Sequence, residues 1–316
     1  MDVDLRRGAD PRMLANQGKN GAECEMPAGN AIFTWKTAGE SASPLLFNSP
    51  HSGAHYSDAF LDMVALDAHH LRRSEDMAVD QLFLPVVARG HSLFAAAFPR
   101  AFIDVNREPY ELDPRLFEGD LPAYANTKSL RVAAGLGTIA RVVADGEDIY
   151  AKRWPIQAAL ERIETYYHPY HEALAHHLLR LKQHHGVAVL VDCHSMPTLS
   201  SPHAERRADI VLGDRFGKSC DPLLCEVIEQ SLVACGYRVT RNKPFAGGFI
   251  TEHYGRPAQG LHAIQIEISR SLYMDERTYQ QTPHFGPLQQ HLMQMVDALD
   301  AALGDFIADQ RRWAAE

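Results

Sequence analysis

Reactive side chains follow three short apolar runs of this sequence. They are His51 after Pro44–Ser49, Arg107 after Ala101–Asn106, and His194 after Val187–Asp192. Such runs are typical of buried strands, and ligands of open α/β sheets bind beyond the carboxyl ends of the strands. We therefore expect the three side chains to meet at one edge of a sheet, where imidazoles suit a metal ion and a guanidinium suits an anion.

His51 and His194 are the leading candidates for metal ligands. Neutral imidazole binds zinc, and a catalytic zinc ion keeps three protein ligands and one open position for water. We expect Asp76 to be the third ligand, with Glu75 beside it as the alternative carboxylate. The segment Ser74–Asp80 is also typical of a helix start, where the helix dipole favours acidic residues. A purely structural role for both carboxylates therefore stays open.

Glu267 is the candidate general base. In the expected strand His262–Ser269, isoleucines alternate with polar residues, which places Glu267 on the face opposite the isoleucines. Burial of an unpaired carboxylate is unfavourable and raises its pKa toward neutrality, as general acid–base catalysis requires. An ion pair between Glu267 and a structural arginine is the alternative.

Positively charged groups near these candidates favour a substrate with a free carboxylate. Arg107 can hold a carboxylate through two parallel hydrogen bonds. Arg270 and Arg100 would add positive charge, although a structural salt bridge is equally expected for Arg100. The turn at Gly247–Thr251 fits a mobile lid as well as a plain loop, and it matches no nucleotide-binding glycine motif.

Alternating strand and helix patterns indicate the scaffold that would position these groups. Further strands are expected at Ser92–Phe98, Asp209–Gly213 and Tyr237–Thr240, and apolar stripes of helical spacing run over 156–181 and 288–306. Pro169 should interrupt the first of these helices, and Gly186 should end it. The pattern predicts an α/β fold, a three-layer α/β/α sandwich with a mostly parallel mixed central sheet. Residues 1–30 are expected to form a loose leader, and residues 31–316 a single domain.

Composition excludes several classes of protein. The chain has 316 residues, of which 46% are hydrophobic and 22% charged, as in an ordinary globular protein. Its formal charge of -9 disfavours nucleic acid as a partner. No apolar run reaches the roughly 20 residues that span a bilayer, and the first residues lack the apolar stretch expected of a secretory signal, so we expect none there. Five cysteines without a CxxC pair fit a reduced, cytoplasmic setting.

Several motifs occur in the order seen in the N-formylglutamate amidohydrolase family, so the chain resembles that family over most of its length. They are SPHSG at 49–53, the Asp-x-x-Val-Asp pattern at 76–80, FIDVNREP at 102–109, VDCHSMP at 191–197, GGFIT at 247–251 and IQIEISRSLYMDE at 264–276. The family is similar to the zinc carboxypeptidases and the aspartoacylase group. The resemblance implies a phosphorylase/hydrolase-like α/β/α fold and one Zn²⁺ ion per chain.

The resemblance also implies the parts of a catalytic centre. His51 and His194 match the two histidine ligands, Asp76 the position of an acidic ligand, and Glu267 the glutamate that activates water. The carboxypeptidases instead place a glutamate three residues after the first histidine, where this chain has Ala54.

The substrate contacts that the resemblance implies come from two further motifs. Asn106 and Arg107 match an Asn-Arg pair that holds a substrate carboxylate, and Arg270 and Thr251 lie in motifs expected to bind substrate. The implied reaction is hydrolysis of N-formyl-L-glutamate to formate and L-glutamate, a late step in one route of histidine breakdown.

Three other functions are alternatives. The same site would serve a deacylase of another N-acyl amino acid, and the scaffold would also suit a non-catalytic protein that binds a metal or ligand. A serine hydrolase using Ser52 or Ser195 is the third, but the chain has no G-x-S-x-G motif.

Overall fold

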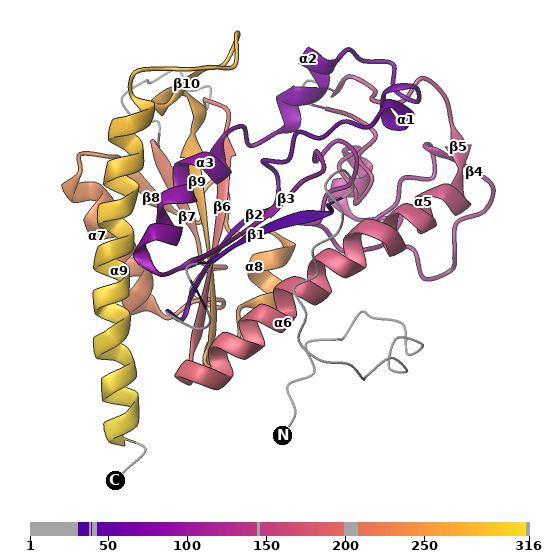
Figure 1. Ribbon diagram of the computed structural model, residues 1–316. Coiled ribbons are helices and arrows are strands. Elements are labelled where there is room, and N and C mark those ends of the chain that lie inside the picture. The colour runs from indigo at the N-terminus through magenta and orange to yellow at the C-terminus, as the bar shows by residue number, and fades with distance from the viewer. Residues whose placement is uncertain (1–30, 38, 40–42, 144–145, 199–207, 314–316) are drawn as a thin grey trace.

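A seven-stranded mixed sheet forms the centre of the molecule (Figure 1). The computed structural model describes residues 31–313 apart from 38, 40–42, 144–145 and 199–207. The strands, in sheet order, are β1 (Phe33–Lys36), β3 (Ser92–Ala96), β2 (Leu45–Ser49), β6 (Ala188–Met196), β9 (Leu261–Ser269), β7 (Ile210–Gly213) and β8 (Val239–Arg241). The leader predicted at 1–30 lies outside the described residues.

The four central strands β3, β2, β6 and β9 run parallel to one another. Edge strand β1 is antiparallel to β3, and β7 is antiparallel to β9 but parallel to β8. The mostly parallel mixed sheet is therefore confirmed. Because the central strands are parallel, their carboxyl ends lie at one edge of the sheet, where we expected the reactive side chains.

Helices cover both faces of the sheet and complete the three layers (Figure 1). On one face lie α3 (Val79–Phe83), α7 (Pro222–Ala234) and α9 (Phe285–Trp313), whose apolar side chains pack on the isoleucines of β9. On the other face lie α5 (Ile156–Arg162), α6 (His168–His185) and α8 (Phe249–Tyr254). In the described part of the chain, no helix is long and apolar enough to span a bilayer.

The remaining elements are short. Helices α1 (Asp58–Leu61), α2 (Ala68–Leu71) and α4 (Leu130–Ala133) lie in the connections. Short 3-10 helices lie at Arg72–Ser74, Leu84–Arg89, Pro257–Gln259 and Arg270–Leu272. Two small sheets pair β4 (Phe117–Glu118) with β5 (Trp154–Pro155) and β10 (Met274–Asp275) with β11 (Gln280–Gln281).

The strand predicted at Ala101–Asn106 is wrong, because this segment consists of turns and irregular backbone. The Asp104 carboxylate accepts a hydrogen bond from the N–H of Asn106 at 2.9 Å. Such a local bond gives the backbone an alternative to a strand ladder. Ala101, Ile103 and Val105 are nevertheless buried, so the apolar alternation reflects a loop that packs onto the core.

The interruption predicted near Pro169 is confirmed. A π-helical segment, Ile163–Tyr167, separates α5 from α6 just before this proline. Proline has no N–H to donate to the preceding turn, so the regular hydrogen-bond ladder cannot continue through it. Helix α6 ends at Gly186, whose φ of +85° lies in the left-handed region.

Candidate active site

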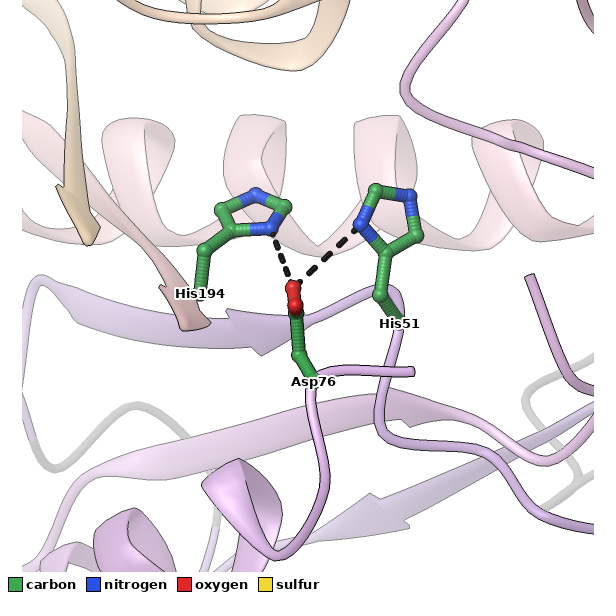
Figure 2. Close-up of side chains that lie close together, drawn as sticks. All are labelled: His51, Asp76 and His194. Carbon is green, nitrogen blue, oxygen red and sulfur yellow. Dashed lines mark hydrogen bonds and ion pairs between the residues drawn. The ribbon is translucent and has the colours of Figure 1, made fainter. Parts of the chain in front are cut away.

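His51, Asp76 and His194 converge at the carboxyl edge of the sheet (Figure 2). One ligand atom of each lies within 4.8 Å of the others. Nδ1 of His194 is 2.8 Å, and Nδ1 of His51 3.4 Å, from the same carboxylate oxygen, Oδ2 of Asp76. His51 follows β2, Asp76 precedes α3, and His194 lies within β6, and all three are buried.

Two further carboxylates orient the histidines. Nε2 of His51 donates to Oδ1 of Asp104 at 2.7 Å, and Nε2 of His194 donates to Oδ2 of Asp192 at 3.0 Å. With the proton on Nε2, each imidazole turns the lone pair of Nδ1 toward Asp76, as in carboxylate–histidine–zinc triads.

This donor set fits a divalent cation such as zinc. The buried Nδ1 of His51 has no hydrogen-bond partner among the described residues. Two nitrogen lone pairs and a carboxylate oxygen that face one point are unfavourable unless a cation or a proton lies between them. Two imidazoles and one carboxylate are also the ligand types that catalytic zinc sites use.

Glu75 is bonded away from the three candidate metal ligands. Its Oε1 accepts from the Tyr56 hydroxyl at 2.5 Å, and its Oε2 accepts from Nε of Arg72 at 3.1 Å.

Glu75 and Asp76 do not begin a helix as predicted, because α3 begins only at Val79, after Ala78 with a φ of +59°. Instead the N–H of Asp76 donates to the carbonyl of His51 at 2.9 Å, which ties two of the candidate ligands together.

Charges in the cluster stabilise each other despite burial. Burial alone would raise the pKa of Asp76, but the hydrogen bond with His194 and the neighbouring imidazole of His51 hold this pKa well below its usual range. Burial would lower the pKa of His194, but Asp192 and Asp76 raise it well above its usual range. The surroundings therefore favour an ionised Asp76 carboxylate facing the two imidazoles, at the place where a metal cation would bind.

Glu267 lies on β9 beside His194 of β6, with which it is in register. Its Oε1 accepts a hydrogen bond from Nε2 of Gln265 at 2.8 Å. Burial raises the pKa of Glu267 to about 7; the charge of Asp76 also raises it, whereas His194 and Arg100 lower it. Among the described residues Glu267 forms no ion pair with an arginine, so the arrangement favours proton transfer near neutral pH over a structural role.

A cavity of about 480 Å³ lies in front of these groups. His51, His194 and Glu267 line it. Six arginines line it as well: Arg73, Arg100, Arg107, Arg131, Arg215 and Arg270. A positively charged cavity in a protein of net charge -9 suits an anionic ligand.

Arg107 and Asn106 both lie at the cavity, held by the protein around them. Arg107 donates from Nε to the carbonyl of Leu136 at 3.0 Å and from a terminal nitrogen to that of Asn106 at 2.8 Å. Burial lowers its pKa to about 10, so Arg107 stays cationic at neutral pH. The Asn106 carbonyl oxygen accepts from the N–H of Ile250 at 2.8 Å, and its amide nitrogen lies 3.2 Å from Nε2 of His194.

Arg270 and Thr251 lie in different settings. Arg270 lines the cavity and donates to the backbone carbonyl of Glu75 at 2.6 Å and to the Ser195 hydroxyl at 3.1 Å, which fixes the loop that carries Asp76. Thr251 is fully buried in α8 and is not among the described residues that line the cavity. The structure therefore brings the predicted residues Asn106, Arg107 and Arg270 to the site but not Thr251.

Sequence reasoning missed Asp104 and Asp192, the carboxylates that orient the histidines. Asp192 lies two residues before His194, and alternate residues of a strand share a face, so this signal was present. Asp104 lies in an irregular loop, where spacing gives no such signal. Strand β6 also continues past the apolar run to Met196. The hydrogen bond between the side chains of Asp192 and His194 allows both polar groups to be buried within the strand.

Comparison with known proteins gives consistent matches. A sequence model of the N-formylglutamate amidohydrolase family matches residues 43–274. An N-formylglutamate deformylase of Pseudomonas putida is 34% identical over 265 residues, covering 81% of this chain and 92% of the relative. An N-formylglutamate deformylase of Pseudomonas aeruginosa is 32% identical over 239 residues, covering 74% of this chain and 83% of the relative.

A solved structure gives a similar result. The crystal structure of N-formylglutamate amidohydrolase from Ralstonia eutropha JMP134 superposes with a TM-score of 0.80 at 35% identity. The match covers 89% of this chain and 100% of that one.

Proposed function

The chain belongs to the N-formylglutamate amidohydrolase family, and from this premise we propose that it is a zinc-dependent hydrolase of the formyl amide of N-formyl-L-glutamate. The products would be formate and L-glutamate. One observation carries the proposal: His51, Asp76 and His194 converge beside Glu267 in a cavity lined by arginines. The deformylase names of two relatives support an amide substrate.

The metal would be held by Nδ1 of both histidines and by the Asp76 carboxylate. When bound, zinc lowers the pKa of a water molecule to about 7 and polarises a carbonyl oxygen. Asp104 and Asp192 keep the proton of each imidazole on Nε2 and so keep Nδ1 available. Arg270 fixes the backbone next to Asp76.

Glu267 would move the proton that amide hydrolysis requires. Its Oε1 is held by Gln265, which leaves Oε2 to accept a proton from water as the water oxygen attacks the formyl carbon. The C–N bond then breaks, and Glu267 returns the proton to the departing nitrogen. Arg107 would hold a substrate carboxylate and so align the amide with these groups.

We assign this activity to residues 31–316 as one catalytic domain, because the candidate ligands come from strands of one sheet and the loop that precedes α3. Four free cysteines in the described residues, three of them buried, support a reduced, cytoplasmic setting. A role in histidine breakdown would follow from the substrate.

The test is formate release from N-formyl-L-glutamate by wild type and Glu267→Gln after metal removal and zinc reloading. We expect Glu267→Gln to bind zinc normally but to lose about 100-fold or more in rate, the usual effect of a general base. Glu161→Gln, which changes an exposed glutamate of α5, is the matched control. Undiminished hydrolysis by zinc-loaded Glu267→Gln would refute the assignment.

The serine-hydrolase alternative finds no support at the site. The Ser195 hydroxyl donates a hydrogen bond to Oδ1 of Asp76 at 3.2 Å, and the Ser52 hydroxyl accepts one from the Ser49 hydroxyl at 2.8 Å. Among the described residues, neither is hydrogen-bonded to a histidine that could act as its base. Activity that a chelator abolishes and zinc restores would separate the two mechanisms.

A further inference from the structure

The proposed substrate carries two carboxylates, and the mechanism above accounts for one. If Arg107 holds the carboxylate next to the amide, the side-chain carboxylate enters the same cavity and needs a cation of its own, because an unpaired buried charge is unfavourable. The cavity offers several further arginines. Which of them is available depends on the carboxylate that each one already serves.

Arg100, Arg131 and Arg270 each pair with a buried carboxylate of the protein. The partner of Arg270 is Asp76, at 3.6 Å. Nε of Arg100 donates to Asp104 at 2.9 Å. A terminal nitrogen of Arg131 lies 3.7 Å from Oε2 of Glu111, a buried atom that has no hydrogen bond among the described residues. A substrate that recruited any of these arginines would draw it away from a buried carboxylate, which is unfavourable.

Arg215 is paired differently. Its terminal nitrogen lies 2.6 Å from the Glu252 carboxylate, and the Glu252 side chain is 61% exposed. Exposed ion pairs contribute little, since water solvates the released carboxylate well. A substrate carboxylate in the partly dehydrated cavity can therefore replace Glu252 on this guanidinium at little cost. Arg73 also pairs with an exposed carboxylate, that of Glu147.

The backbone distinguishes Arg215 from Arg73. Arg215 and Phe216 have φ of +54° and +57°, a left-handed conformation that is unfavourable for residues other than glycine. The side-chain oxygen of Asn242 stabilises this conformation, because it accepts hydrogen bonds from the N–H groups of Asp214 at 3.1 Å and of Phe216 at 3.2 Å. Strain that the surrounding structure holds in this way is concentrated at functional sites.

In this conformation the Arg215 side chain packs against the turn at Gly247. The N–H of Arg215 donates to the carbonyl of Ala246 at 2.8 Å, and a terminal nitrogen lies 3.4 Å from the carbonyl of Gly247. A Cβ atom on Gly247 would lie 2.9 Å from Cγ2 of Thr251 and 3.2 Å from Cδ of Arg215, so a glycine here leaves room for both side chains. We propose that Arg215 binds the side-chain carboxylate of the substrate and thereby selects acidic N-formyl amino acids, an inference that rests on the proposed function.

The test compares N-formyl-L-glutamate with N-formyl-L-glutamine, a neutral substrate of nearly the same shape, for the zinc-loaded enzyme. In Arg215→Met we expect kcat/KM for N-formyl-L-glutamate to fall about 10- to 100-fold, mainly through KM, the usual loss of a hydrogen bond between charged groups. The value for N-formyl-L-glutamine should change less than about 3-fold, because its amide makes no ion pair. Arg215→Gln repeats the test with a polar side chain, and the binding of the product L-glutamate, measured by calorimetry, should weaken in parallel.

Three variants serve as comparisons. Arg89→Met is the matched control, because Arg89 is 35% exposed and paired with an exposed aspartate, Asp297, away from the cavity. Arg73→Met and Arg131→Met should keep the preference for N-formyl-L-glutamate. An unchanged preference in both folded Arg215 variants, or a preference lost only in Arg73→Met or Arg131→Met, overturns the assignment. A wild-type enzyme that hydrolyses neither substrate overturns the proposed function itself, and the role of Arg215 falls with it.

Discussion

Asp104 connects the candidate metal ligands to the positively charged wall of the cavity. Its Oδ1 accepts from Nε2 of His51 and from the N–H of Asn106, and its Oδ2 accepts from Nε of Arg100. Burial would raise the pKa of Asp104, but Arg100, Arg107 and His51 hold it well below its usual range. An ionised carboxylate at this position keeps the Nδ1 lone pair of His51 directed at the proposed metal.

Replacement of Asp104 by asparagine should weaken zinc binding about 10- to 100-fold, the usual effect of losing such an outer carboxylate. Competition with a chromogenic chelator measures this affinity directly. Asp113→Asn is the control, because Asp113 is a buried carboxylate that also binds two arginines, Arg115 and Arg141. Equal zinc affinity in Asp104→Asn and Asp113→Asn would contradict this role.

At the scale of single residues, the sequence indicated which side chains to examine but not how they meet. Strand ends and alternation pointed to His51, His194 and Glu267, and the structure places all three at one cavity. Their catalytic roles stay predictions. The separation of Glu75 from Asp76 depends on contacts with Tyr56 and Arg72, which no spacing in the sequence indicates.

At the scale of elements, apolar runs located the central strands, since strands buried on both faces consist of continuous apolar residues. Strand β1 was missed because it is short and half-buried at the sheet edge. The loop at 101–106 was mistaken for a strand because a loop that packs onto the core carries the same alternation. The order of the strands could not be predicted, because the pairing of β6 with β9 joins segments far apart in the sequence.

Helix α6 contacts the site through His171. Nε2 of His171 donates to the carbonyl of Val105, next to Asn106, and Nδ1 contacts the hydroxyl of Tyr254 in α8, both at 2.8 Å. Burial of the ring lowers the pKa of His171 to about 3. The neutral imidazole thus joins two helices to the loop that carries the substrate-binding candidates.

This contact predicts an acid-sensitive fold. The unfolded chain binds a proton at His171 below about pH 6.5, whereas the folded protein does so only near pH 3, so stability falls as the pH is lowered through this window. His171 contributes up to about 1.4 kcal/mol of unfolding free energy per pH unit. Urea unfolding at several pH values should show a smaller slope for His171→Gln than for wild type. His176→Gln, at an exposed histidine of the same helix, should keep the wild-type slope, and equal slopes in all three proteins would disprove the idea.

At the scale of the whole molecule, the proposed metal would join segments that are distant in sequence. Residues 51, 76 and 194 lie after β2, before α3 and in β6. A ligand that binds only the folded state stabilises it, by about 2.7 kcal/mol when its concentration is 100 times Kd.

Removal of zinc should therefore lower the melting temperature, and zinc but not magnesium should restore it. Differential scanning calorimetry of the stripped and reloaded protein measures the shift. Glu267→Gln should show the full shift, because it keeps all three ligands, and Asp104→Asn a smaller one. A melting temperature that does not respond to zinc would exclude a metal at these residues.

The nine-residue pairing of β6 with β9 sets His194 and Glu267 side by side through backbone hydrogen bonds, whereas Arg215 lies on a loop. The proposed reaction and the proposed choice of substrate would thus depend on separate parts of the fold. Replacement of residues 214–217 by a different segment would then retarget the enzyme to other acylated amino acids and leave the two paired strands unchanged.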